Sequence, residues 1–360
     1  MAFAFPVWLA VQEALLEDEP TEAEKENPSC FDEFDDAALF EHFHLTRPCI
    51  SFIVDAVRFR MKTVSYRRAS PPVDVFVMVA LNFFAHGAFT PAVVQKIGSC
   101  LHSSLPSAAN SASGVIAGMS DVFISFPFTQ DARDQNAAVM EEFCKIPNVL
   151  GVLAPVQFKI RASPYEKESF KSFINAQGFT SVMSQFICDS TGNILSVEKC
   201  CVGSTAEQEL WEYSFKGREV EEDLHGKYWL IAGPGYHLGN HVLTAVAKPE
   251  TIEDVLFNEA HAKMLNVMQE TVDLLKRRFL CLMQLGFTEE GSLNKKLNII
   301  KACSVLHNIA LKFSVPPPTR ARKTEPLYSG KHLAAETNID ALMARKELIK
   351  KTFSKPKNQD

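Results

Sequence analysis

Apolar residues recur every three to four positions through much of the first third of the chain, which is the spacing of a buried helix face. Four segments show this spacing: residues 45–59, 73–89, 91–97 and 109–124. The first segment has Thr46 as a candidate N-cap and Pro48 in its first turn, and the second ends near Gly87. The pattern predicts an all-helical, helix-turn-helix (HTH)-like domain over residues 40–146.

The pattern changes at Pro147, after which short apolar runs alternate with longer helical stretches. Strands are expected at residues 149–153, 181–188, 194–200 and 228–232. Helices are expected at residues 205–215, 251–282 and 294–313. Asp189 and Gly192 mark a hairpin turn between the second and third runs. This order predicts a mixed α/β domain over residues 147–315.

Charge divides the chain into three parts that the formal net charge of −6 conceals. Residues 1–40 carry a net charge of −10 and residues 320–360 a net charge of +5, so the part between them is nearly neutral. We therefore expect an acidic, flexible arm over residues 1–39 and a basic tail over residues 316–360. A nearly neutral body does not indicate nucleic-acid binding by bulk charge, so any such binding has to use local patches.

Several function classes are excluded or disfavoured by what the chain lacks. No apolar stretch is long enough for a transmembrane helix, and the apolar start has no basic region typical of a signal peptide, so an amphipathic helix is expected there. The nine cysteines contain no CxxC pair, which favours reduced thiols in the cytosol or nucleus. There is also no Walker loop, no GxSxG elbow and no zinc-site spacing.

The most informative signal is a set of phrases in a fixed order. These are GVLAPVQF (151–158), FINAQG (173–178), SQFICDSTGNILSVE (184–198), VGSTAEQELW (202–211), YWLIAGPGYHLGNHVLT (228–244), LFNEAHAKMLNVMQETVDLLKRRFLCL (256–282) and IIKACSVLHNIAL (299–311). Together they resemble the catalytic domain of the Harbinger/PIF family of transposase-derived nucleases. Upstream, HLTRPCISFIV and VMVALNFFAHGAF also resemble this family, so the resemblance covers about three quarters of the chain.

The resemblance implies an RNase H-like α/β fold, a mixed sheet with flanking helices, and an active site of the DDE superfamily. In such a site two Mg²⁺ or Mn²⁺ ions, about 3.5–4 Å apart, activate the nucleophile and stabilise the leaving oxygen of a phosphodiester. Hard cations require oxygen ligands, and ions held this close require formal negative charge beside them. The resemblance also implies a Myb/SANT-type nuclear partner and contact with DNA.

The chain departs from the family at the positions that would hold the metal ions. Where the family has carboxylates, this sequence has Ala154 in the first strand, Gly233 after the WLIA strand and Gln269 on the long helix. A fourth family carboxylate is retained as Glu207. The family's basic pair in the FINAQG region is replaced by Ala176 and Gln177. The resemblance therefore implies a degenerate site with at most weak binding of one metal ion at Glu207.

Neighbouring acids provide an alternative, which is a nuclease with relocated ligands. Asp273 lies one helical turn beyond Gln269, whereas Glu270 points about 100° round the helix. Asp189 lies in the hairpin turn. This alternative predicts that Glu207, Asp189 and Asp273 converge in the fold.

A basic cluster closes the first predicted helix and leads into the next: Arg58, Arg60, Lys62, Arg67 and Arg68. These side chains are candidates for contacts with DNA phosphates, or they balance the charge of the acidic arm. His261 and His307 lie on mostly apolar helices, where packed, hydrogen-bonded histidines are expected rather than ligands or bases.

Taken together, these observations predict a domesticated, transposase-derived protein without nuclease activity that acts as a DNA- or protein-binding factor in the nucleus, the cytoplasm or both. Two alternatives stay open. One is a divalent-metal-dependent endonuclease with relocated carboxylates, and the other is a protein-interaction scaffold that does not bind DNA. The oligomeric state is not indicated by the sequence.

Overall fold

The computed structural model describes residues 30–63, 72–98, 101, 104–161, 171–224, 227–286, 292–319, 325–327 and 338–354. The apolar start of the chain, where an amphipathic helix is expected, lies outside the described residues. So do most of the acidic arm and much of the basic tail.

The region before the sheet is helical, as the periodicity predicts. Its elements are η1 (Cys30–Glu33), α3 (Asp36–Phe43), α4 (Arg47–Thr63), α5 (Val73–His86), α6 (Pro91–Ile97), α7 (Leu105–Ala117), α8 (Ser120–Phe123) and α9 (Gln130–Cys144). The four predicted helical segments are confirmed, the last of them divided between α7 and α8. The HTH-like character of residues 40–146 stays a prediction.

Helix α5 is the centre of this region, because most of its side chains are buried. It ends at Gly87, whose φ of 71° is in the left-handed region that glycine adopts without strain. Helix α5 packs on α3, α7 and the short helix η4 (Leu280–Met283). Helix η4 lies much later in the sequence, after the strands of the sheet. One hydrophobic cluster therefore runs from the N-terminal helices into the α/β region.

The sheet is mixed, with strands in the order β3-β2-β1-β5-β6 and β4 paired to β2. The strands are β1 (Val149–Lys159), β2 (Ser181–Cys188), β3 (Ile194–Val197), β4 (Cys201–Val202), β5 (Trp229–Ala232) and β6 (Val242–Leu243). Strand β2 is antiparallel to β1 and β3, whereas β5 is parallel to β1 and β6. This confirms the α/β class and is consistent with a DDE nuclease fold.

Strand β1 extends six residues beyond its predicted end at Leu153. Its partner β5 stops at Ala232, which is paired with Leu153, while pairing with β2 continues to Lys159. From Ala154 to Phe158 β1 is paired on one side only among the described residues, and beyond that its second side forms a bridge between Ile160 and Leu285. Pro155 lies in this part, where a strand tolerates a residue without an N–H group.

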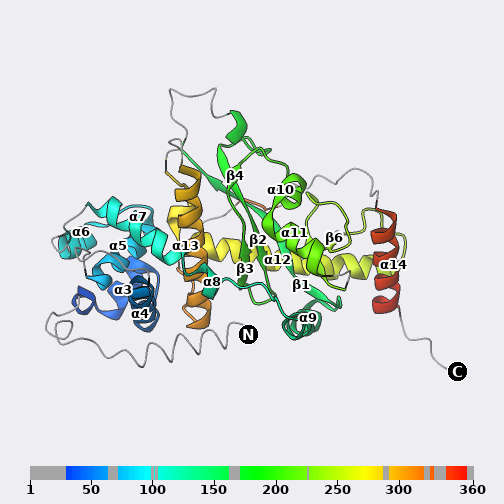
Figure 1. Cartoon of the computed structure of the whole chain (residues 1–360), viewed down its shortest axis with the longest axis horizontal. Coiled ribbons are helices and arrows are strands. Elements are labelled where there is room, and N and C mark those ends of the chain that lie inside the picture. Colours follow the sequence, from blue (N-terminus) through cyan, green and yellow to red (C-terminus); the bar gives the residue numbers. More distant parts are fainter. Residues whose placement is uncertain are drawn as a thin grey trace.

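Helices lie on both faces of the sheet (Figure 1). The long helix α12 (Ile252–Arg278) packs on β1 and β5, while α10 (Glu207–Tyr213) and α11 (Phe215–Asp223) belong to the second hydrophobic cluster, on the other face. Helix α13 (Ser292–Lys312) packs against α7, and α14 (Ile339–Phe353) packs against α12. None of the described helices is both long and apolar enough to cross a membrane.

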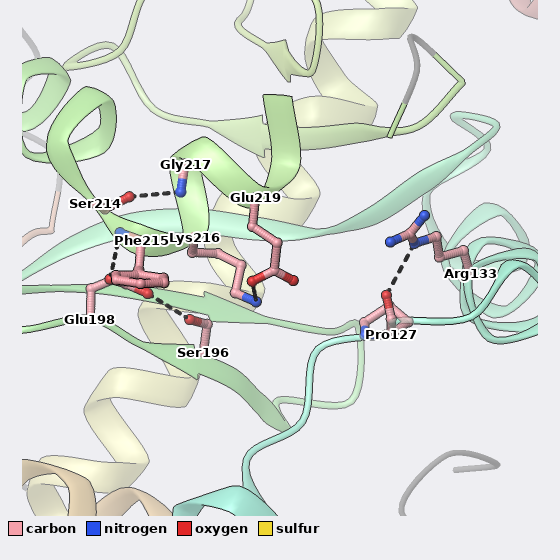
Figure 2. Close-up of polar contacts among 9 residues, drawn as sticks. All are labelled: Pro127, Arg133, Ser196, Glu198, Ser214, Phe215, Lys216, Gly217 and Glu219. Atoms are coloured by element: carbon pink, nitrogen blue, oxygen red, sulfur yellow. Dashed lines mark hydrogen bonds and ion pairs between the residues drawn. The ribbon is translucent and has the colours of Figure 1, made fainter. Parts of the chain in front are cut away.

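A tight junction joins α10 to α11 (Figure 2). The Ser214 hydroxyl accepts a hydrogen bond from the Gly217 N–H at 2.8 Å, and the Phe215 N–H donates to Glu198 at 3.3 Å. A Cβ atom on Gly217 would lie 2.1 Å from the Trp211 carbonyl oxygen, so glycine is required there. The junction fixes the direction of α10 and, with it, the position of Glu207.

Candidate functional site

Ala154 and Gly233 lie beside each other where β5 ends. The preceding residues, Leu153 and Ala232, are directly paired in the parallel ladder between β1 and β5. Side chains alternate along a strand, and Ala154 is fully buried in the cluster that α12 covers, whereas Leu153 faces the other cluster. The fold thus brings together two positions that the sequence resemblance identified 79 residues apart.

Helix α12 is fixed across these strand ends by His261. Its ring Nε2 donates to the Ala232 carbonyl at 3.1 Å and lies 3.3 Å from the Leu243 carbonyl oxygen. Burial lowers the pKa of His261 to about 4, so the ring is neutral at physiological pH. His261 is therefore a packed structural side chain, as predicted.

Gln269 lies two turns further along α12 and is half-buried. Both polar atoms of its side-chain amide form hydrogen bonds. Nε2 donates to Asp273 Oδ1 at 2.8 Å, and Oε1 accepts from the Leu327 N–H at 2.9 Å. The carbonyl oxygen that a metal ion would need is thus engaged by the backbone of the C-terminal segment.

Glu207 begins α10 and lies against the loop that follows β5. A Cβ atom on Gly235 would lie 1.1 Å from Glu207 Oε2, so the carboxylate occupies the space that the glycine leaves open. Gln208 accepts a hydrogen bond from the His237 N–H at 2.8 Å and fixes the same loop. Burial raises the pKa of Glu207 to about 7, so about half of these carboxyls carry a proton at neutral pH.

These four positions do not fit a binuclear metal centre. Ala154 and Gly233 provide no side-chain oxygen, Gln269 is neutral and hydrogen-bonded, and Glu207 is only partly ionised. Within the described ranges, no group of three or more His, Cys, Asp and Glu side chains is arranged to hold a metal ion.

The relocated-ligand alternative required three acids to converge, and the structure does not bring them together. Asp189 caps the turn between β2 and β3, where its Oδ1 accepts from the N–H groups of Thr191 at 2.8 Å and Asn193 at 3.0 Å. Asp273 accepts from Gln269, and no metal-binding group forms around these acids and Glu207.

Gln177, one of the two residues that replace the family's basic pair, lies near the same C-terminal segment as Gln269. Its Nε2 donates to the Pro326 carbonyl at 3.2 Å. Ala176 precedes it and is exposed. Two substituted family positions therefore contact consecutive residues of one segment.

Sequence reasoning missed a lysine at this place. Lys276 on α12 is buried, donates to the Gln157 carbonyl at 2.8 Å and lies over the Phe158 ring. Burial lowers its pKa to about 8. Lys276 lies in the phrase LLKRRF, but the phrase alone does not indicate that the side chain turns toward the unpaired edge of β1.

The basic cluster is described only in part. Arg58 is ion-paired to Asp55 at 2.5 Å, and Arg60 to Asp121 at 3.5 Å. Arg67, Arg68 and the side chain of Lys62 lie outside the described residues. Both described arginines therefore have a carboxylate partner.

His307 on α13 is also buried, and its Nε2 donates to the Gly192 carbonyl at 3.0 Å. Burial lowers its pKa to about 4. The contact fixes the turn between β2 and β3 against α13, which is a structural role, as predicted.

Comparison with known proteins agrees with the resemblance. Residues 155–308 match the family described as DDE superfamily endonuclease. The chain is 28% identical over 330 residues to the Xenopus laevis protein named "Putative nuclease HARBI1", and 27% identical to the Homo sapiens and Bos taurus proteins of that name. Each alignment covers 90% of this chain and 92% of the relative. No solved structure is significantly similar.

Proposed function

We propose that the chain is a domesticated member of the Harbinger transposase-derived nucleases, which it resembles over 90% of its length, and that it binds its targets without cutting DNA. The scaffold of the nuclease is retained, and the metal-dependent chemistry is lost.

The observation that carries this proposal is the set of side chains at the strand ends. Ala154 and Gly233 are adjacent and have no ligand atom in their side chains, and the Gln269 amide is hydrogen-bonded at both ends. Glu207 is the single acid left among the four family positions.

Electrostatics explains why one acid is insufficient. Two divalent ions 4 Å apart repel each other by about 4 kcal/mol even at the dielectric constant of water, and by more inside a protein. Carboxylates normally offset this repulsion and the loss of hydration. Glu207 alone supplies at most one negative charge, and its burial favours the protonated form when no ion is bound.

The test is a nuclease assay on the purified full-length chain with Mg²⁺ or Mn²⁺, combined with calorimetric titration of Mn²⁺. We expect no turnover and no Mn²⁺ binding tighter than roughly 10⁻⁴–10⁻³ M, the range of the weakest calcium sites in proteins. Turnover that Glu207→Ala abolishes and Glu209→Ala leaves intact would overturn the proposal. Glu209 is the matched control because it lies exposed on the same helix.

The binding role is proposed for the nucleus, with a Myb/SANT-type protein as the partner that the family resemblance implies. DNA contact would use the basic residues of α4, among which Arg58 and Arg60 are half-exposed at that helix's end. Lysine and arginine contacts to phosphates make affinity fall steeply with salt.

A protein-interaction scaffold without DNA binding is the second candidate. It is favoured by the carboxylate partners of both arginines, because a neutralised cation attracts phosphate weakly. An electrophoretic shift at about 50 and 200 mM salt separates the candidates, since six to ten phosphate contacts lower affinity by about 10³–10⁵ over this range. A flat salt response with intact partner capture would favour the scaffold.

A further inference from the structure

Residues 325–327, a Glu-Pro-Leu segment far along the chain, lie on the face where the family positions were replaced. The Leu327 N–H donates to Gln269 Oε1 at 2.9 Å, and the Pro326 carbonyl accepts from Gln177 Nε2 at 3.2 Å. The Glu325 carboxylate forms an ion pair with Lys159 at the end of β1. Each of the three residues thus has its own polar contact.

The leucine of this segment, Leu327, is packed into the hydrophobic core. The Leu327 side chain is only 8% exposed and belongs to the main hydrophobic cluster. Burying a leucine stabilises a contact by about 1.5–3 kcal/mol. The segment therefore has an apolar anchor at one end and an ionic contact at the other.

Two lysines provide the positive charge around Glu325. Burial alone would raise the pKa of Glu325, but its hydrogen bond to Lys159 and the charges of Lys159 and Lys276 hold it below the ordinary value. Lys276 is fixed by the Gln157 carbonyl on the unpaired edge of β1. An acid at this position of the segment is thus favoured.

The amide of Gln269 suits this arrangement better than the family's glutamate would. Its oxygen accepts from the Leu327 N–H while its nitrogen donates to Asp273. A glutamate could accept from Leu327, but its second oxygen would lie against the Asp273 carboxylate, and like charges at such a distance repel. The replacement that removes a metal ligand therefore creates a donor–acceptor pair.

We propose that this face is a peptide-docking site, formed by Lys159, Gln177, Gln269 and Lys276, whose ligand is an acid–proline–leucine segment. In this chain the site is filled by its own residues 325–327, which tether the basic tail to the former catalytic face. The site takes a peptide where the family resemblance implies metal ions and DNA. Its existence does not depend on whether the nuclease assay finds activity.

The first test uses the unmodified full-length chain and hydrogen exchange at the Leu327 amide. We expect protection in the wild type and at least a tenfold faster exchange in Gln269→Ala, because the acceptor of that N–H is removed. Exchange of Leu327 at the rate of an unprotected amide in the wild type would overturn the proposal.

The second test asks whether the site takes the segment in trans. Full-length chain carrying Glu325→Lys and Leu327→Asp is titrated with a labelled peptide of residues 322–332, and anisotropy is read. We expect binding to this variant, none to the wild type whose site is filled, and at least tenfold weaker binding when the peptide itself carries Leu327→Asp.

Glu347→Lys, a charge reversal at an exposed position of α14, is the matched control and should behave as the wild type. Equal binding of the peptide to the double variant, the wild type and the control would overturn the docking site. If the double variant does not fold, the exchange measurement on Gln269→Ala decides the question alone.

Discussion

Arg278 and His44 hold each other across 234 residues of chain by two reciprocal hydrogen bonds. Arg278 Nη1 donates to the His44 carbonyl at 2.7 Å, and His44 Nδ1 donates to the Arg278 carbonyl at 2.8 Å. Arg278 Nη2 also donates to the Val315 carbonyl at 2.9 Å. One fully buried side chain at the end of α12 thus joins the N-terminal helices to the segment after α13.

Arg278→Met should lower the free energy of unfolding by roughly 3 kcal/mol or more, because two buried carbonyls lose their donor. Urea denaturation followed by circular dichroism measures this. Arg277→Met is the control, since Arg277 is half-exposed on the same helix, and a change below about 1 kcal/mol is expected there. Equal losses for the two variants would contradict the role assigned to Arg278.

Because the pKa of Glu207 is raised in the folded chain, the free energy of unfolding should decrease as the pH rises from about 4.5 to 7. Burial raises its pKa from 4.5 to about 7 in the folded chain, so between these values the folded state holds a proton that the unfolded state has released. The contribution of Glu207 is therefore most favourable below about pH 4.5 and is lost as pH rises through 7. Because the side chain is half-buried, we expect a loss of roughly 1–3 kcal/mol.

Denaturation of the wild type and Glu207→Gln at pH 5 and pH 8 measures this effect. The variant should be the more stable chain at pH 8, and the two should differ less at pH 5. Glu222→Gln, at an exposed position on α11, should leave the pH dependence unchanged. A parallel pH response in wild type and Glu207→Gln would show that the carboxyl titrates at its ordinary pKa.

Gly235 and Glu207 should be energetically coupled. A methyl group at Gly235 would occupy the place of the carboxylate, so Gly235→Ala should push Glu207 toward solvent and cost about 1–3 kcal/mol. In the double variant with Glu207→Ala the space is free, and the cost of the alanine should largely disappear. A double-mutant cycle with a coupling below about 0.5 kcal/mol would contradict this close approach.

The helices and strands with regular apolar spacing could be predicted from the sequence. Strand β6 could not be, because two residues are too few for any periodicity. Helix α9 was missed because its sequence, QDARDQNAAVMEEFC, is mostly polar, and Met140 is the one large apolar side chain among its buried residues. Its start is set by the Thr129 side chain, which accepts from the Ala132 N–H.

The residues of the candidate site could also be predicted only in part from the sequence. The resemblance identified Ala154, Gly233 and Gln269, and the register of β1 and β5 brings the first two together. The contact between Gln269 and Leu327 spans 58 residues and depends on the tertiary path of the chain, so no local pattern indicates it. The same holds for Glu207, whose raised pKa results from burial against a loop that follows another strand.

DNA binding by α4 would depend on the ion pair between Arg58 and Asp55. Because Asp55 is ion-paired to Arg58 at 2.5 Å, it competes with phosphate for the guanidinium group. If α4 binds DNA, Asp55→Asn should raise the affinity for duplex DNA several-fold, whereas Arg58→Ala should lower it and reduce the slope of log affinity against log salt by about 1. Fluorescence anisotropy at several salt concentrations measures both.

Asp131→Asn, at an exposed position on α9, is the control for the loss of one negative charge. An increase of equal size in that control would assign the effect to net charge alone, and no response to any of the three substitutions would favour the protein-interaction scaffold.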